Sequence, residues 1–279
     1  MPTLFMYRDS GLYAHHTLDH HPRDYAMHAH DVHELYCFLA GQGSYYVEGH
    51  EYPLSPGCIL ALRAGEAHCL HISPDQPYER LAIHFAPSLL DGIDAERALQ
   101  RPFVQRPLGL SALYRPQTLR QDLVQAYLQP LLEARDQHSA GDQRLLVLTV
   151  LLPMLYELSR CFRRLQDEAG TPQNIMVQVI AHLNAHLNET PTADELARRF
   201  YVSKTYLNRH FQHVTGSTVR EYILTKRLML ARQRIRGGVP ASQAAEACGW
   251  GDYSSFYRQY RARFGVSPAQ DKRAAGTPR

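Results

Sequence analysis

Four side chains that can bind a metal ion or a polar ligand stand at regular spacing in the first quarter of the sequence. His28 and His30 are separated by one residue, and Glu34 follows after three more. His68 lies further along the chain. Three imidazoles and a carboxylate suit iron, nickel, manganese or zinc, and the same groups can hydrogen-bond an organic molecule. The spacing therefore predicts a site for a divalent metal or for a small polar ligand.

Glycines continue this pattern at fixed offsets. The residues concerned are Gly41, Gly57 and Gly65, followed by His68. The arrangement resembles the double motif of the cupin β-barrel, with Arg63 standing where a proline is common. Side chains in a strand alternate between two faces, so this resemblance implies that His28 and His30 point into the barrel, with Glu34 beyond them. It also implies that His68 joins them from another strand.

Short strand-forming runs surround these positions. Residues 34–40, 44–48 and 58–62 are separated by turns rich in glycine, which is typical of an all-β region. Aromatic side chains in or beside the runs are candidates for lining a small-molecule pocket, although strands favour tyrosine in any case. These are Tyr36, Tyr45, Tyr46, Tyr52 and Tyr78. We predict that the effector pocket consists of His28, His30, Glu34, Tyr36 and His68.

The two halves of the chain carry opposite charge. Residues 1–171 hold 14 Lys and Arg against 20 Asp and Glu, a net charge of −6, whereas residues 172–279 hold 16 against 7, a net charge of +9. The division falls at a stretch of small residues and proline near 169–172. A basic module attached to an acidic one points to nucleic acid as the partner of the basic half, because Lys and Arg neutralise phosphates.

The basic half contains two predicted helices joined by a tight turn. The first opens with Thr192 as N-cap and Glu195 as its capping-box partner. The second follows Ser203 and ends at Gly216, a C-terminal glycine signal. Two short helices in this arrangement, over residues 192–214, form the helix-turn-helix pattern.

The same pattern recurs 49 residues later. Ser203, Leu207, Arg209, Phe211 and Gly216 return in kind as Asp252, Phe256, Arg258, Tyr260 and Gly265. Ala197 and Ala245 are only 48 residues apart, so the second unit, over 241–264, has one extra residue in its turn. A helix over 219–236 is predicted between the units. A helical connector would place two recognition helices in successive major grooves, about 34 Å apart.

This half of the sequence resembles the AraC/XylS transcription regulators over about 100 residues. The matching positions are Leu196-Ala197, Ser203 to Arg209, Phe211, Gly216, Tyr222, Arg227, Ala231, Gly249-Trp250, Asp252, Ser255 to Arg258, Phe264-Gly265 and Ser267-Pro268. Trp250 stands where the family usually has Phe, and residues 270–273 depart from its usual ending. The resemblance implies a DNA-binding domain over 171–279.

The resemblance also implies which residues contact DNA. They are Ser203, Lys204, Thr205, Tyr206, Asn208 and Arg209 in the first recognition helix, and Tyr253, Ser254, Ser255 and Arg258 in the second. Arginine side chains can pair with guanine and asparagine with adenine. At any one position the alternative is a phosphate contact or a solvated polar face.

The expected fold is α+β with two domains. Residues 1–170 form a cupin-like effector-binding and dimerisation domain, with the barrel over about 1–110 and leucine-rich helices over 117–138 and 142–168. Those leucines predict either a homodimer interface or intramolecular core. The early histidines His15, His16, His20 and His21 predict a solvated arm, or alternatively a lid over the pocket.

Together these features predict a DNA-binding regulator controlled by a small effector, a sugar or another polar metabolite, with no catalytic residues. If it is an activator, RNA polymerase is a further partner. The alternatives are a metal-dependent cupin enzyme and a regulator whose signal is the metal itself. The longest apolar run, 145–156, is shorter than the ~18 residues of a membrane span, and no secretory signal is visible. We therefore expect a cytoplasmic protein.

Overall fold

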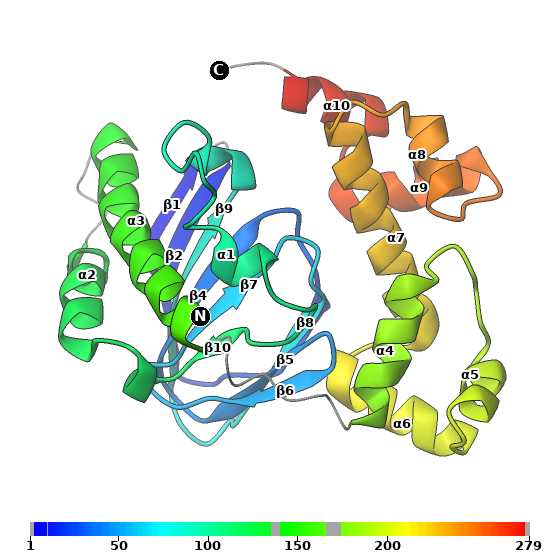
Figure 1. Cartoon of the computed structure of the whole chain (residues 1–279), viewed down its shortest axis with the longest axis horizontal. Helices are drawn as coiled ribbons and strands as arrows, with labels where there is room; N and C mark the ends of the chain where they lie inside the picture. The colour runs from blue at the N-terminus through cyan, green and yellow to red at the C-terminus, as the bar shows by residue number, and fades with distance from the viewer. Residues whose placement is uncertain (1–2, 10, 135–139, 166–173, 277–279) are drawn as a thin grey trace. The chain divides into compact units, whose positions relative to one another are not determined.

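The computed structural model describes residues 3–9, 11–134, 140–165 and 174–276 (Figure 1). Contacts divide the chain into residues 1–26 with 32–171, and residues 172–279 with the short segment 27–31. Strand β3 (Tyr25–His28) belongs to a sheet of the first unit and is described with it. We call the first unit the β-domain and residues 174–276 the helical unit.

The β-domain contains two sheets. The six-stranded sheet has the order β1 (Thr3–Asp9), β2 (Leu12–Asp19), β9 (Tyr78–Phe85), β4 (His33–Ala40), β7 (Ile59–Leu62) and β10 (Leu113–Tyr114). The four-stranded sheet has the order β3, β8 (His68–Ile72), β5 (Gly43–Val47) and β6 (His50–Pro53). Neighbouring strands of the six-stranded sheet run antiparallel. An N-terminal β-rich domain before a helical domain confirms the predicted α+β class.

Alternation along β9 gives the six-stranded sheet two distinct faces. Leu81, Ile83 and Phe85 belong to one hydrophobic cluster together with residues of the helices, and we call this side the outer face. Tyr78 and Ala82 belong to a second cluster with side chains of the four-stranded sheet, and we call this side the inner face. Period-two alternation in a strand produces this separation.

Helices cover the outer face (Figure 1). They are the short η1 (Pro87–Leu90), α1 (Arg101–Val104) and η2 (Pro116–Thr118), followed by α2 (Gln121–Glu133) and α3 (Ala140–Leu165). The predicted helix over 117–138 is therefore shorter than expected at its start, and residues 135–138 lie outside the described residues. Of the second predicted helix, over 142–168, residues 166–168 also lie outside them.

Most leucines of these helices form intramolecular core. Leu131, Leu151 and Leu155 are completely buried in the outer-face cluster. Leu145 on α3 is instead 62% exposed, and Tyr156 on the same helix is 57% exposed. Of the two predicted roles, intramolecular core therefore holds for the buried leucines. Helix α3 also presents apolar side chains to the surface.

Helix α3 is also the one helix among the described residues that is long and apolar enough to cross a membrane. The segment Gly141–Arg164 has a mean hydropathy of 1.7. However, more than half of its most apolar window is buried inside the protein, and buried side chains such as Val147, Val150 and Met154 pack in the outer-face cluster. A core helix passes the same test of length and composition.

The helical unit contains seven helices in its described residues. They are α4 (Ile175–Ala185), α5 (Ala193–Arg199), α6 (Lys204–Thr215), α7 (Val219–Arg236), α8 (Ala241–Ala247), α9 (Tyr253–Phe264) and α10 (Pro268–Gly276). The predicted connector coincides with α7. It begins at a capping box of Thr218 and Glu221 and ends at Gly237, because local signals specify both ends.

Candidate functional site

The inner face of the six-stranded sheet carries a carboxylate surrounded by imidazoles. The Oε2 atom of Glu34 lies 3.2 Å from Nε2 of His84 and 3.7 Å from Nε2 of His68. Glu34 pairs directly with His84 across β4 and β9, which explains their proximity. Glu34 is only 4% exposed and His68 only 1%. This group can bind a metal ion or hold a polar ligand.

The first two predicted histidines are placed differently from the prediction. Strand β3 ends at His28, so His30 lies beyond it, and the expectation that both belong to one strand face is wrong. The two rings are tilted, with centroids 6.3 Å apart. His30 nevertheless offers a ligand atom that lies within 4.8 Å of those of Glu34 and His84. His84, not His28, therefore completes this group.

The structure contradicts the predicted placement of His15 and His16. His15 and His16 were expected in a solvated arm or lid, but they lie in β2, which is hydrogen-bonded between β1 and β9, and both are buried. The side chain of His16 contacts Glu79 at 2.7 Å. The His15 ring stacks on His84 on the inner face. Of the predicted arm, His20 and His21 alone are exposed.

Burial is the main reason that His15 stays neutral. It lowers the pKa of His15 to about 3, and the positive charge of nearby Arg80 acts in the same direction. A neutral imidazole has one donor and one acceptor nitrogen. The Nδ1 atom of His15 is buried and has no hydrogen-bond partner within the described part of the chain.

Arg80, like His84, lies on the inner face and is not among the predicted site residues. Its guanidinium lies over the Tyr25 ring at 4.6 Å and near the Tyr78 ring at 5.6 Å. The Tyr78 hydroxyl in turn hydrogen-bonds that of Tyr36 at 2.8 Å. Alternation along β9 was an available signal, since Arg80 and His84 both point opposite to the apolar residues Leu81 and Ile83.

The predicted pocket tyrosines separate into two groups. Tyr36, Tyr45 and Tyr78 are buried in the inner-face cluster. Burial and the neighbouring Tyr78 raise the pKa of Tyr36 well above its ordinary value, so this phenol stays protonated. Tyr52 instead donates to the backbone oxygen of Gly109, and the Tyr46 ring packs edge-on against His71.

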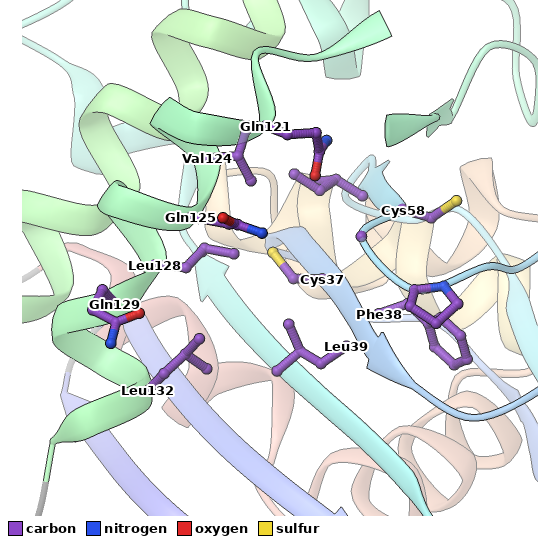
Figure 2. Close-up of a pocket in the computed structure, with 13 residues that line it drawn as sticks. Cys37, Phe38, Leu39, Cys58, Gln121, Val124, Gln125, Leu128, Gln129 and Leu132 are labelled. Atoms are coloured by element: carbon purple, nitrogen blue, oxygen red, sulfur yellow. The ribbon is translucent and has the colours of Figure 1, made fainter. Parts of the chain in front are cut away.

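A separate cavity of about 430 Å³ lies on the outer face, beneath α2. Figure 2 shows that the amides of Gln121, Gln125 and Gln129 border it together with apolar side chains of the same helix. Cys37 and Cys58 line the opposite side. Burial raises the pKa of Cys37 to about 12, so its thiol is unreactive at neutral pH. None of the predicted pocket residues lines this cavity.

In the helical unit, α6 presents the first set of predicted DNA contacts. Leu207 and Phe211 are buried, while every predicted contact residue, Ser203, Lys204, Thr205, Tyr206, Asn208 and Arg209, is exposed. Ser203 caps the helix by accepting a bond from the Tyr206 backbone. The Lys204 ammonium pairs with Asp194 at 2.7 Å. Arg209 is exposed and has no such bond to any residue that the structure describes.

The second set, on α9, repeats this arrangement. Phe256 and Tyr260 are buried, Tyr253, Ser254 and Arg258 are exposed, and Ser255 is half-buried. Both recognition helices end in a glycine with positive φ, 68° at Gly216 and 72° at Gly265. Four residues separate α5 from α6, while five separate α8 from α9, as the one-residue difference in spacing predicts.

Two polar networks fix the helices around α7. The Arg227 guanidinium donates to the backbone oxygens of Glu189 and Gly249 at 2.9 and 3.2 Å. Asp271 of α10 is 2% exposed and accepts bonds from Arg232 and Tyr260, at 2.6 and 2.7 Å. Arg236 donates to the same carboxylate at 2.9 Å. These bonds tie α7 to the segment between α4 and α5, to the turn between α8 and α9, and to α9 and α10.

Comparison with known proteins identifies the class. Residues 12–151 match the AraC-like ligand binding domain, and residues 196–274 match a helix-turn-helix domain family. The chain therefore belongs to the AraC-type transcription regulators, and it is a DNA-binding regulator controlled by an effector. This confirms the resemblance stated from the sequence.

Among the particular relatives is the transcriptional activator RhaS of Klebsiella pneumoniae, 26% identical over 86% of this chain and 85% of its own length. The transcriptional regulator CdhR of Pseudomonas aeruginosa is 38% identical over 37% of this chain and 31% of its own length. Among solved structures, ToxT of Vibrio cholerae aligns over 96% of this chain and 99% of its own, with 12% identity and a TM-score of 0.40.

Proposed function

We propose that this regulator is a cytoplasmic transcription activator whose effector binds on the inner face of the β-domain. Two matched recognition helices on one connector carry the DNA-binding part of this proposal. Helix α7 has 18 residues, which at 1.5 Å each gives about 27 Å. The similarity of the whole chain to the activator RhaS supports activation of transcription, with RNA polymerase as a further partner.

The effector acts through its preference between two states of the protein. A ligand shifts an equilibrium only by the difference between its affinities for the two states. The predicted residues Glu34, Tyr36 and His68 supply hydrogen-bonding groups among buried aromatic side chains. A hydroxylated metabolite matches that chemistry, since such pockets combine an apolar lining with a few placed polar groups.

The DNA contacts are tested with single substitutions in the full chain. A binding site is first selected from random DNA by the wild-type protein, and affinities are then measured by fluorescence anisotropy. We expect Arg209→Ala and Arg258→Ala each to lose about 1–3 kcal/mol, and to relax specificity in different halves of the site. Arg263→Ala, which removes the same charge from the last turn of α9, is the control. Equal losses in all three variants would contradict the assignment.

A homodimer through α3 is the second part of the proposal. Leu145 and Tyr156 are exposed, and Leu148 and Leu152 lie between them on the same helix, partly buried. The spacing of these four residues places them along one stripe of the helix. Sedimentation of the wild type and of Leu145→Lys tests this. A wild-type monomer, or a variant that still dimerises with unchanged affinity, would contradict it.

The carboxylate and imidazoles favour a second candidate, a regulator whose signal is a metal ion. Glu34 and His84, with His30 and His68 beside Glu34, fit the histidine and carboxylate set preferred by divalent transition metals. Such a metal would supply positive charge and open positions for a ligand. The dependence of DNA affinity on metal alone, without an organic molecule, would favour this candidate. A metal-dependent cupin enzyme is less well supported, because the relatives are transcription regulators.

Metal content distinguishes these candidates. The protein is purified without a histidine tag or chelator, and metal per chain is measured by elemental mass spectrometry. Near-stoichiometric metal in the wild type, lost in Glu34→Ala with His84→Ala, would establish the site. An empty wild type would eliminate the metal candidate and leave these side chains to the organic effector.

A further inference from the structure

We infer that the effector is a small organic carboxylate and that Arg80 binds its carboxylate group. This inference rests on the proposed function, because it names the chemical class of ligand for the same inner face. It narrows the predicted effector, a sugar or another polar metabolite, to one that carries a carboxylate.

The first observation is that the Arg80 guanidinium lacks an anionic partner. Its Nε atom is buried and has no hydrogen-bond acceptor among the residues that the structure describes. Over the same residues the Arg80 guanidinium forms no ion pair within 4.0 Å, and its one hydrogen bond is a 3.4 Å contact from Nη1 to the Tyr78 hydroxyl. Buried donors without acceptors destabilise a protein, so Arg80 is better suited to binding than to support.

The second observation is the geometry of its surroundings. The rings of Tyr25 and Tyr78 lie against the guanidinium, and cation–π contacts of this kind favour the charged group without satisfying its N–H donors. The planar guanidinium has a donor geometry that matches a carboxylate through two parallel hydrogen bonds. The nearby carboxylate Glu34 is already placed against His68 and His84.

Arg80 is half-buried, and a fully buried arginine of the same domain provides the contrast. Arg106 is 5% exposed and pairs with Glu66 through both terminal nitrogens, at 2.8 and 2.6 Å. It also donates to the backbone oxygens of Ala61, Pro102 and Leu110. Arg106 therefore has all of its donors matched, whereas Arg80 does not.

The neighbouring groups narrow the ligand further. His84 and Glu34 lie on the same face of adjacent strands, and His15 is stacked on His84. A neutral imidazole can donate or accept a hydrogen bond and an ionised carboxylate accepts one, so both groups recognise hydroxyls. A carboxylate that also carries hydroxyl groups, such as a sugar acid, matches both parts of this face.

The test compares matched neutral and acidic ligands by thermal shift on the full chain. The probes are galactose with galacturonate, glucose with gluconate, and glucose 6-phosphate. We expect at least one of the two carboxylates to raise the Tm of the wild type while its neutral counterpart does not. Arg80→Met should abolish this shift, and Arg80→Lys should retain part of it. A shift with the neutral sugars or the phosphate alone, or no shift with either carboxylate, would overturn the inference.

Ligand-free variants provide an independent measurement. We expect Arg80→Met to raise the Tm of the free protein, because it removes an unmatched charge, and Arg106→Met to lower it strongly. If both variants lower the Tm equally, Arg80 is structural and the inference is wrong. Ligand-free DNA binding by the wild type tests the regulator proposal separately. A wild type that binds DNA but ignores both carboxylates would overturn the carboxylate assignment alone.

Discussion

The hydrogen-bond networks around α7 and the inner face of the β-domain treat buried polar groups in opposite ways. In the helical unit, Asp271 and Arg227 are surrounded by donors and acceptors that match them. On the inner face, Nε of Arg80 and Nδ1 of His15 are buried without partners in the described residues. Native proteins satisfy nearly all of their buried polar groups, and exceptions concentrate where function requires them. The comparison separates a scaffold that holds helices in place from a surface prepared for a ligand.

The strongest test of this contrast removes the carboxylate of Asp271. Asp271→Ala removes the acceptor of Tyr260 and leaves Arg232 with the more distant carboxylate of Asp31, at 3.4 Å. We therefore expect a loss of about 3 kcal/mol in the free energy of unfolding of the helical unit. This loss lies at the lower end of the range for removing one partner of a buried ion pair, because the Arg232 and Arg236 side chains are partly exposed. Urea unfolding followed by Trp250 fluorescence measures it, since the chain has one tryptophan.

The control for this measurement is an exposed ion pair in the same unit. Asp194 pairs with Lys204 at the surface, where such pairs contribute about 0–1 kcal/mol. Asp194→Ala should therefore change the unfolding transition little. A loss as small in Asp271→Ala as in the control would mean that this buried network does not stabilise the unit.

The next test uses pH to examine the inner face. Because the pKa of His15 is lowered to about 3 in the folded protein, the unfolded chain binds a proton near pH 6.5 that the folded chain excludes. Stability should therefore fall as pH decreases from 6.5 toward 3, by about 1 kcal/mol from this residue between pH 6.5 and 5.5 and by about 1.4 kcal/mol per pH unit below that. Calorimetry at pH 6.5 and 5.5 should show a smaller decrease for His15→Gln.

His20→Gln is the matched control, since His20 is an exposed histidine five residues away. This variant should retain the pH dependence of the wild type. If His15→Gln and His20→Gln behave alike, the inner face does not exclude the proton from His15, and its polar groups are better solvated than the structure indicates.

The smallest expected change in stability concerns Tyr201, whose backbone conformation in the helical unit is unfavourable. Tyr201, in the turn before α6, has φ of 55° and is 96% exposed. A left-handed backbone is unfavourable for a side chain with Cβ, and glycine relieves it. Tyr201→Gly should stabilise the unit by about 0.5–1 kcal/mol in the same urea experiment. Destabilisation would show that the Tyr201 side chain makes a contact that supports the turn.

The sequence predicted the helical unit better than the inner face, for a physical reason. Both ends of α7 are specified by residues within one turn of them, Thr218 with Glu221 and then Gly237. By contrast, the contact of Glu34 with His84 joins positions 50 residues apart and depends on the register of β4 and β9. The same holds for His15, whose burial follows from the position of β2 inside the sheet. Local signals in one sequence do not determine which residues of two distant strands lie opposite each other.

The connector α7 controls rotation as well as distance. Each residue of an α-helix adds 1.5 Å of length and about 100° of turn. Inserting one residue in α7 would therefore move α9 little but would turn it to a different side of the helix axis. Four added residues would nearly restore its orientation while adding about 6 Å. Changes of length in this connector are thus limited by angle more tightly than by distance, and the accessible spacings between the two halves of a DNA site follow the period of the helix.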